Sequence, residues 1–199
     1  MVLMFFVVRC GRRVRMRAAA LGVAALAAAV APGAATAATS GAQVTVTGGS
    51  LSLSAGDFQG QSASLTGADQ VLQTTPAAPW SAVDARGTGA SWSVVASATD
   101  LVSVGTPNRV IPSSALALTT GAISAGTGAD AVTGMTGATG SPFTVPSGPG
   151  QTNVGVLSAP GPHRGAYTFT PRLDITIPAT ALASYVGNPY TTTLTVTIS

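Results

Sequence analysis

Two kinds of charged side chain are missing from this sequence of 199 residues, which has no lysine and no glutamate. Nine arginines and six aspartates carry all of its formal charge at pH 7. Glycoside hydrolysis needs a pair of carboxylic acids, and the lack of glutamate argues against that chemistry. The single cysteine and the single histidine, Cys10 and His163, cannot supply a tetrahedral zinc site, so neither a metal nor another cofactor is expected.

The arginines are concentrated near the N-terminus. Five of them precede an apolar run of 14 residues at positions 18–31, and Ala35-Thr36-Ala37 has the small residues of a cleavage site. This pattern is typical of a secretory signal peptide over residues 1–37. The run is shorter than the roughly 20 residues that span a bilayer, so the mature chain is expected to have no transmembrane anchor. We expect a secreted protein that is extracellular or associated with the cell wall.

The expected mature chain, residues 38–199, has the size of a single domain. It keeps four arginines and six aspartates, for a net charge of −2. A nucleic-acid partner is not expected, because such binding depends on positive charge. Cys10 lies in the segment to be removed, so the mature protein is expected to have no disulfide.

Apolar and polar residues alternate in the C-terminal part of the chain. Tyr167, Phe169 and Leu173 share one parity within residues 167–177, and residues 193–198 repeat the pattern. Such alternation predicts half-buried β-strands. No amphipathic helix occurs elsewhere in the mature chain, so another sheet must cover the apolar face. The sequence predicts an all-β protein, an antiparallel β-sandwich of immunoglobulin-like or Greek-key type.

Other strands are predicted from the same pattern and from turn residues. Residues 80–85 and 91–97 flank a glycine-bearing loop and are expected to form a β-hairpin. The C-terminal strands, 167–177 and 193–198, are expected to share a sheet. The remaining predictions are a hairpin or kinked strand over 43–47 and 50–54, and strands at 61–66, 71–75 and 152–157. Residues 119–150 are expected to form long surface loops with one or two short edge strands, for example at 143–145.

Catalytic and calcium sites have weak support. His163 and Asp174 allow a Ser/His/Asp triad to be imagined, but no serine lies in a G-x-S-x-G elbow, and a histidine in a Pro-Gly loop is expected to be solvated. Residues 126–132 resemble one turn of a calcium-binding nonapeptide repeat, but a single copy cannot stack on a neighbour, so a loop is expected. We expect no enzyme activity.

Two groups of residues are candidates for structure or binding. Asp84 and Arg86 stand beside Gly87 at the predicted turn, where they would form a salt bridge that pins the hairpin or bind an acidic or amide-bearing ligand. Trp92 also has the parity of a core residue between two sheets. The aromatic residues available to stack on a sugar or line a groove are Trp80, Trp92, Tyr167, Tyr185 and Tyr190.

Several short stretches follow one another in a recognisable order: VDARG at 83–87, WSV at 92–94, IPSSAL at 111–116, YTFTP at 167–171 and TLTVTI at 193–198. Their order and spacing resemble the WxL-domain surface proteins, above all the short secreted members from actinobacteria. The resemblance covers residues 43–199. Trp92-Ser93-Val94 stands where the first W-x-L motif would be, and Leu194-Thr195-Val196 stands at the second, without tryptophan.

This resemblance implies a β-rich domain that attaches noncovalently to the Gram-positive cell wall, with peptidoglycan as the ligand. The expected function is therefore that of a non-catalytic surface protein bound to the wall. The alternative is a structural or adhesive surface protein that acts through self-association or a protein partner, using threonine-rich faces and an exposed edge strand.

Overall fold

The structure, a computed structural model, describes residues 43–143 and 153–199. The predicted signal peptide, residues 1–37, lies outside the described residues. Residues Thr45–Ser199 form one compact unit that contains all of the strands. Over the described ranges no helix is long and apolar enough to cross a membrane.

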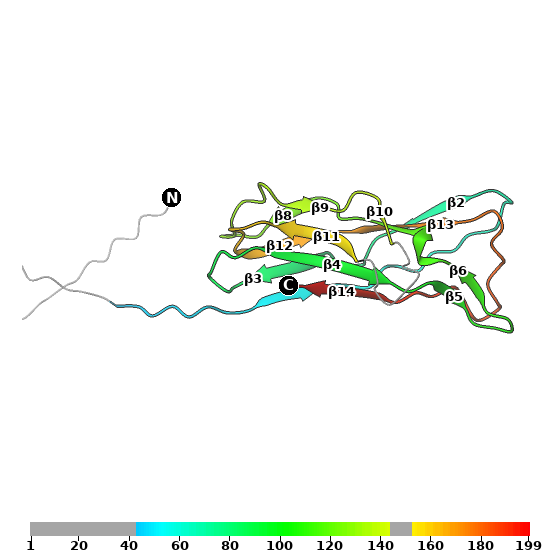
Figure 1. The fold of residues 1–199 in the computed structure, drawn as a ribbon, viewed down its shortest axis with the longest axis horizontal. Coiled ribbons are helices and arrows are strands. Elements are labelled where there is room, and N and C mark those ends of the chain that lie inside the picture. Colours follow the sequence, from blue (N-terminus) through cyan, green and yellow to red (C-terminus); the bar gives the residue numbers. More distant parts are fainter. Residues whose placement is uncertain (1–42, 144–152) are drawn as a thin grey trace, which may run out of the picture. The chain divides into compact units, whose positions relative to one another are not determined.

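The regular secondary structure of the described residues consists of antiparallel strands and one 3-10 helix, with no α-helix (Figure 1). The prediction of an all-β sandwich is confirmed. The elements are β1 Leu51–Ser54, β2 Gln70–Thr74, β3 Trp80–Asp84, β4 Trp92–Ala98, β5 Leu101–Ser103, β6 Arg109–Ile111, η1 Ser113–Ala115, β7 Leu116–Thr119, β8 Ile123–Ala125, β9 Thr136–Gly137, β10 Ser141–Pro142, β11 Val154–Ala159, β12 Gly165–Phe169, β13 Arg172–Ile177 and β14 Leu194–Ile198.

One layer of the sandwich consists of two sheets placed end to end. The first sheet has the order β1-β3-β12-β8 and the second β10-β7-β13-β2. β12 runs directly into β13, β7 into β8, and β2 into β3, so the same three stretches of chain pair with one another in both sheets. The other layer is the sheet β14-β4-β11-β9, and the β5–β6 hairpin lies at one end of the unit (Figure 1).

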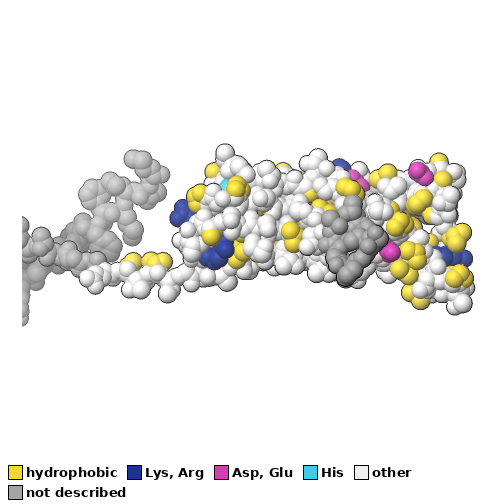
Figure 2. Space-filling view, in the orientation of Figure 1, with side chains coloured by type: hydrophobic (Ala, Val, Ile, Leu, Met, Phe, Trp, Pro, Cys, Tyr) yellow, Lys and Arg dark blue, Asp and Glu magenta, His cyan; other side chains and the backbone are white. Residues whose placement is uncertain are grey.

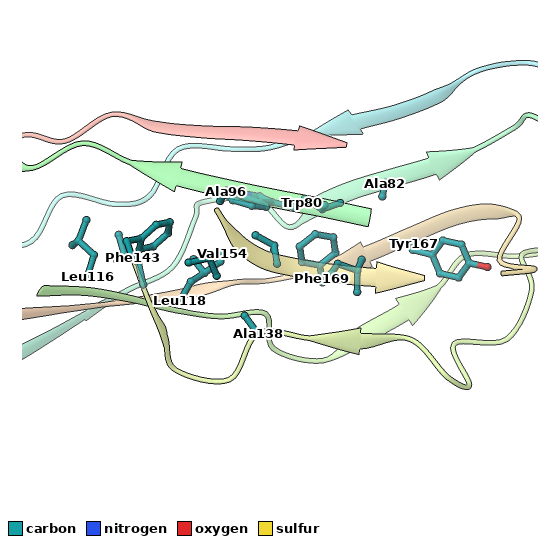
Figure 3. Close-up of a cluster of buried hydrophobic side chains, with 14 of the residues drawn as sticks. Trp80, Ala82, Ala96, Leu116, Leu118, Ala138, Phe143, Val154, Tyr167 and Phe169 are labelled. Atoms are coloured by element: carbon teal, nitrogen blue, oxygen red, sulfur yellow. The ribbon is translucent and has the colours of Figure 1, made fainter. Parts of the chain in front are cut away.

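Alternating side chains from both layers build the core. In β12 and β13, Tyr167, Phe169 and Leu173 are buried, as is Pro171 between the strands, so the parity predicted from the sequence continues across the break. In β4, Trp92 and its alternate neighbours are buried in the same way. Period-2 alternation places one side of each strand against the opposite layer, and Figure 3 shows the resulting cluster between the strands.

A buried threonine joins the layers where β7 passes into β8. The hydroxyl of Thr120, a residue 1% exposed, donates to the carbonyl of Val156 in β11 and accepts from the N–H of Ala138 at 2.8 Å. The N–H of Thr120 donates to the carbonyl of Ala138 at 2.9 Å. Polar groups of both layers are thereby satisfied at the place where the ladder of the first layer is interrupted.

Thr120→Val is therefore expected to lower the free energy of unfolding by about 1 kcal/mol, because the Val156 carbonyl and the Ala138 N–H each lose one buried partner and keep their bond to each other at 3.1 Å. Urea denaturation measures the effect. Thr168→Val, which makes the same change at an exposed position of β12, should alter stability by about 0.5 kcal/mol or less. Equal effects of the two substitutions would contradict the assigned role of the Thr120 hydroxyl.

The predicted hairpin of residues 80–85 and 91–97 is wrong, although both strands form. β3 pairs with β1 and β12, whereas β4 pairs with β11 and β14 in the other layer. Residues 85–91 are an arch between layers. In a hairpin, the tryptophans at the starts of β3 and β4 would belong to one sheet, whereas the arch lets both layers contribute a tryptophan to the core.

The C-terminal strands also fail to share a sheet. β13 is central in the first layer, and β14 is an edge strand of the second. The connection between them, residues 178–193, runs round the end of the unit beside β5 and β6 (Figure 1). A connection of this length can cross between layers, so alternation in both strands does not establish that they pair.

Several smaller predictions need correction. Residues 43–47 and 61–66 are not strands, and β1 pairs with β3 instead of forming an N-terminal hairpin. Within residues 119–143 the chain forms β8, β9 and β10, and Phe143 is a core residue, 1% exposed, instead of an edge-strand residue. Val145 lies outside the described residues. The strands expected near 71–75 and 152–157 are present as β2 and β11.

Candidate functional site: a groove at the β5–β6 end

Three of the five aromatic residues predicted to bind a ligand lie in the core. Trp80, Trp92 and Tyr167 are 1%, 3% and 0% exposed. The ring centroids of Trp92 and Tyr167 are 5.7 Å apart, and Trp80 meets Phe169 edge to face at 5.9 Å. Their polar atoms are satisfied within the fold, as the indole N–H of Trp80 donates to the Gly56 carbonyl at 2.9 Å. These side chains therefore offer no surface to a ligand. This corrects the binding prediction for Trp80 and Tyr167, whereas Trp92 occupies the core position that its parity predicted.

His163 is buried, 4% exposed, and not solvated as expected from its Pro-Gly loop. The N–H of Gly161 donates to Nδ1 at 3.2 Å, so Nε2 carries the proton and donates to the Thr133 carbonyl at 3.1 Å. The His163 carbonyl accepts from the Trp92 indole at 2.9 Å. Asp174, the imagined triad partner, pairs with an arginine on its own strand. The described residues do not assemble a Ser/His/Asp triad on this ring.

Asp84 and Arg86 form an ion pair that holds the arch between β3 and β4. The Asp84 carboxylate accepts from the Arg86 backbone N–H, Nε and Nη2, each at 3.0 Å. Nη2 also donates to the Ala90 carbonyl at 3.0 Å, across the turn where Gly87 has a φ of +73°. Hydrogen bonds from the Arg86 side chain hold the pKa of Asp84 below its ordinary value.

Asp130, the one carboxylate of the calcium-like segment, is also paired with an arginine. Its Oδ2 accepts from the backbone N–H of Arg164 at 2.8 Å and from Arg164 Nε at 2.9 Å. The hydrogen bonds from Arg164 lower the pKa of Asp130. No group of three or more potential metal-binding side chains occurs among the residues that the structure describes.

The two remaining aromatic candidates, Tyr185 and Tyr190, come together at the β5–β6 end. Val102 in β5 exchanges two backbone hydrogen bonds with Thr191, at 2.9 and 3.1 Å. The buried hydroxyl of Ser103 donates to the Asn188 carbonyl at 2.6 Å and accepts from the Tyr185 N–H at 2.9 Å. These bonds attach the connection 178–193 to the hairpin, so residues far apart in sequence form one surface.

Tyr185 has a structural position in this surface. The Arg109 guanidinium lies over its ring, 3.8 Å from the centroid, and its hydroxyl donates to the Pro107 carbonyl at 2.8 Å. A Cβ atom added at Gly105 would lie 2.1 Å from the ring, so only glycine leaves room for it there. Arg109 also donates to the carbonyl of Ala183. Tyr185 thus orients Arg109.

An open groove of about 320 Å³ lies beside the stacked side chains of Arg109 and Tyr185, and we call it the end groove. Tyr190 is part of its wall, with its hydroxyl bound to the Leu182 carbonyl at 2.9 Å. Val110 and Leu182, 52% and 61% exposed, add apolar surface. Figure 2 shows apolar side chains gathered at this end. The lining residues are Asn108, Arg109, Val110, Ile111, Pro112, Pro178, Thr180, Ala181, Leu182 and Tyr190.

Arg109 gives the end groove its charge. Arg86, Arg164 and Arg172 each pair with an aspartate, whereas Arg109 has no carboxylate partner among the described residues. The groove therefore combines one cation, one phenol ring and exposed aliphatic side chains, a set that suits an uncharged or anionic ligand with both polar and apolar parts.

Sequence reasoning named Tyr190 but missed Arg109, Val110 and Leu182. One signal was available for the arginine: Arg86 and Arg172 each have an aspartate two residues away in the sequence, and Arg109 does not. The apolar members gave no signal, because isolated exposed valines and leucines are common.

The sequence matches no family model, and no curated protein or solved structure is significantly similar to it. The end groove is therefore assigned from its own geometry.

Proposed function

We propose that this protein is a secreted, non-catalytic surface protein that associates with the cell wall through the end groove, with peptidoglycan as the ligand. The observation that carries the proposal is the groove itself, where Arg109 and Tyr190 stand among the exposed side chains of Val110 and Leu182. The resemblance to WxL-domain proteins supports the choice of the wall as the partner.

The chemistry of the groove fits such a polymer. Peptidoglycan carries N-acetylated sugars and peptides with free carboxylates. A guanidinium group binds carboxylates through charge-assisted hydrogen bonds, and a phenol ring packs against the apolar face of a sugar. Val110 and Leu182 are placed to contact methyl groups of the acetyl or peptide parts.

Sedimentation of the mature protein with wall sacculi over a range of salt concentrations tests this function. The mature chain has a net charge of −2, so general attraction to an anionic wall is weak, and retention should persist at high salt. Leu182→Asp places a carboxylate in the groove and should reduce the affinity about tenfold or more, which corresponds to about 1.4 kcal/mol.

The matched control is Leu65→Asp, which changes an exposed leucine outside the groove lining and should leave retention unchanged. Wild-type protein that stays in the supernatant would rule out wall binding. Equal retention of the two aspartate variants would leave wall binding standing but remove the end groove as its site.

A further inference from the structure

β14 is an edge strand of the second layer. In the sheet order β14-β4-β11-β9, its hydrogen-bonded partner among the described residues is β4 alone, and β1 of the other layer lies beside it without pairing. Ser199 exchanges two backbone hydrogen bonds with Ser93, at 2.8 and 3.0 Å, and the Thr99 N–H donates to the Thr193 carbonyl at 3.1 Å. Hydrogen-bonded pairs alternate along an antiparallel ladder.

It follows that the odd-numbered residues of this segment face β4. The N–H and C=O groups of Leu194, Val196 and Ile198 point away from it, along the free edge. An unpaired edge of this kind is a template for another strand.

The usual protections of an edge strand are absent from β14. Natural sheets discourage pairing with charged side chains, especially lysine, with proline or with a bulge. β14 and its flanking residues, 191–199, read TTTLTVTIS, without charge or proline, and its register with β4 is regular. The neighbouring side chains are threonine hydroxyls and aliphatic groups, which tolerate a paired strand.

The same chain carries a segment with the properties of a missing partner strand. Residues 43–47, QVTVT, alternate valine with polar residues, lack charge and proline, and have high β-propensity. They belong to no strand, and Val44 and Val46 are 87% and 86% exposed. Five residues match the length of β14, which likewise alternates aliphatic residues with threonine.

We propose that residues 43–47 of one copy of this protein add as a strand to the free edge of β14 in a second copy. The addition pairs the outward backbone groups of β14 and covers the two exposed valines. Donor and acceptor are different surfaces of one molecule, so repeated addition is head to tail and builds a filament unless it closes into a ring. This self-association goes beyond wall binding, because neither segment contributes to the end groove.

Sedimentation velocity of the chain starting at Ala38 tests the proposal, and its wild type should show a mass that rises with concentration. The donor variant Val44→Lys/Val46→Lys should weaken association about tenfold or more. The acceptor variant Val196→Pro removes an outward N–H and no hydrogen bond to β4, and it should weaken association to a similar extent. Because each variant keeps one half of the contact, an equimolar mixture of the two should form heterodimers and nothing larger.

The matched control is Ser62→Lys/Ser64→Lys, which adds the same charge at the same spacing in an exposed segment and should assemble like the wild type. A synthetic peptide of residues 42–48 in excess should dissociate wild-type assemblies, and a peptide with lysine at both valine positions should not. This measurement decides the question even if Val196→Pro fails to fold.

A wild type that stays monomeric at every concentration would overturn the proposal. So would a donor variant that assembles like the wild type, or assemblies that the peptide leaves intact. Leu182→Asp is expected to assemble normally, so failure of strand addition and failure of wall binding are distinguishable.

Discussion

Replacing Trp92 with alanine is expected to lower the free energy of unfolding by about 3–5 kcal/mol. Trp92 is 3% exposed and packs on Tyr167, so truncation leaves a cavity between the layers. The indole N–H also donates to the carbonyl of His163, which would lose that partner. Urea denaturation, followed through the fluorescence of the remaining Trp80, measures the change.

The companion variant Trp92→Phe retains most of the apolar volume, so it should lower the free energy of unfolding clearly less than Trp92→Ala does. Since Trp92 lies in the core, wall retention of Trp92→Ala should fall only in proportion to the unfolded fraction. A fully stable Trp92→Ala protein would refute the core role, and a folded variant that no longer binds the wall would show that Trp92 contacts the ligand.

Replacing Asp84 with alanine should produce the second largest loss, about 2–3 kcal/mol, because three hydrogen bonds from Arg86 to a buried carboxylate disappear. The Asp84 side chain is 0% exposed, and that of Arg86 is 27% exposed. The arch between β3 and β4 then depends on the bonds from Arg86 to backbone carbonyls. Thermal and urea unfolding both report the effect.

Asp174→Ala is the matched control. Asp174 and Arg172 are also two residues apart and form a bidentate pair, but their side chains are 18% and 44% exposed. Exposed pairs contribute little, so this substitution should cost less than about 1 kcal/mol. Similar losses of stability from Asp84→Ala and Asp174→Ala would mean that burial does not determine how much the Asp84–Arg86 pair stabilises the fold.

The Asp84 variant should also change how stability depends on pH. Arg86 holds the pKa of Asp84 below its ordinary value, so the folded state binds fewer protons at this group than the unfolded state. The stabilisation is fully present above the ordinary pKa of about 4 and is lost as pH falls through the lower folded pKa. The difference in stability between wild type and Asp84→Ala should therefore shrink in acid, and a difference independent of pH would contradict this assignment.

The candidate binding surface could be predicted only in part from the sequence. Tyr190 was named from the sequence as an aromatic residue available for binding, but its neighbour Arg109 lies in a hairpin far away in the chain. Trp80 and Tyr167 were named for the same reason and are buried. An aromatic side chain supports either packing or stacking on a ligand, and its position in the fold decides between them.

His163 illustrates the same limit for a polar residue. Its Pro-Gly loop indicated a solvated side chain, yet backbone groups from two loops, at Gly161 and Thr133, enclose its ring. Loop composition describes the local chain. It carries no information on which other loop packs against it.

The sequence by itself determined the strand class, the buried parity of Tyr167, Phe169 and Leu173, and the local pairing chemistry of Asp84 with Arg86. These properties depend on residues one or two positions apart in the chain, so the alternation of apolar and polar residues in the sequence indicates them. The tertiary structure alone decided that β3 and β4 belong to different layers, that β14 is an edge, and that the connection 178–193 completes a groove with β6. Those outcomes depend on which long-range pairing buries the most apolar surface with its backbone groups satisfied, and many pairings are compatible with the same local alternation.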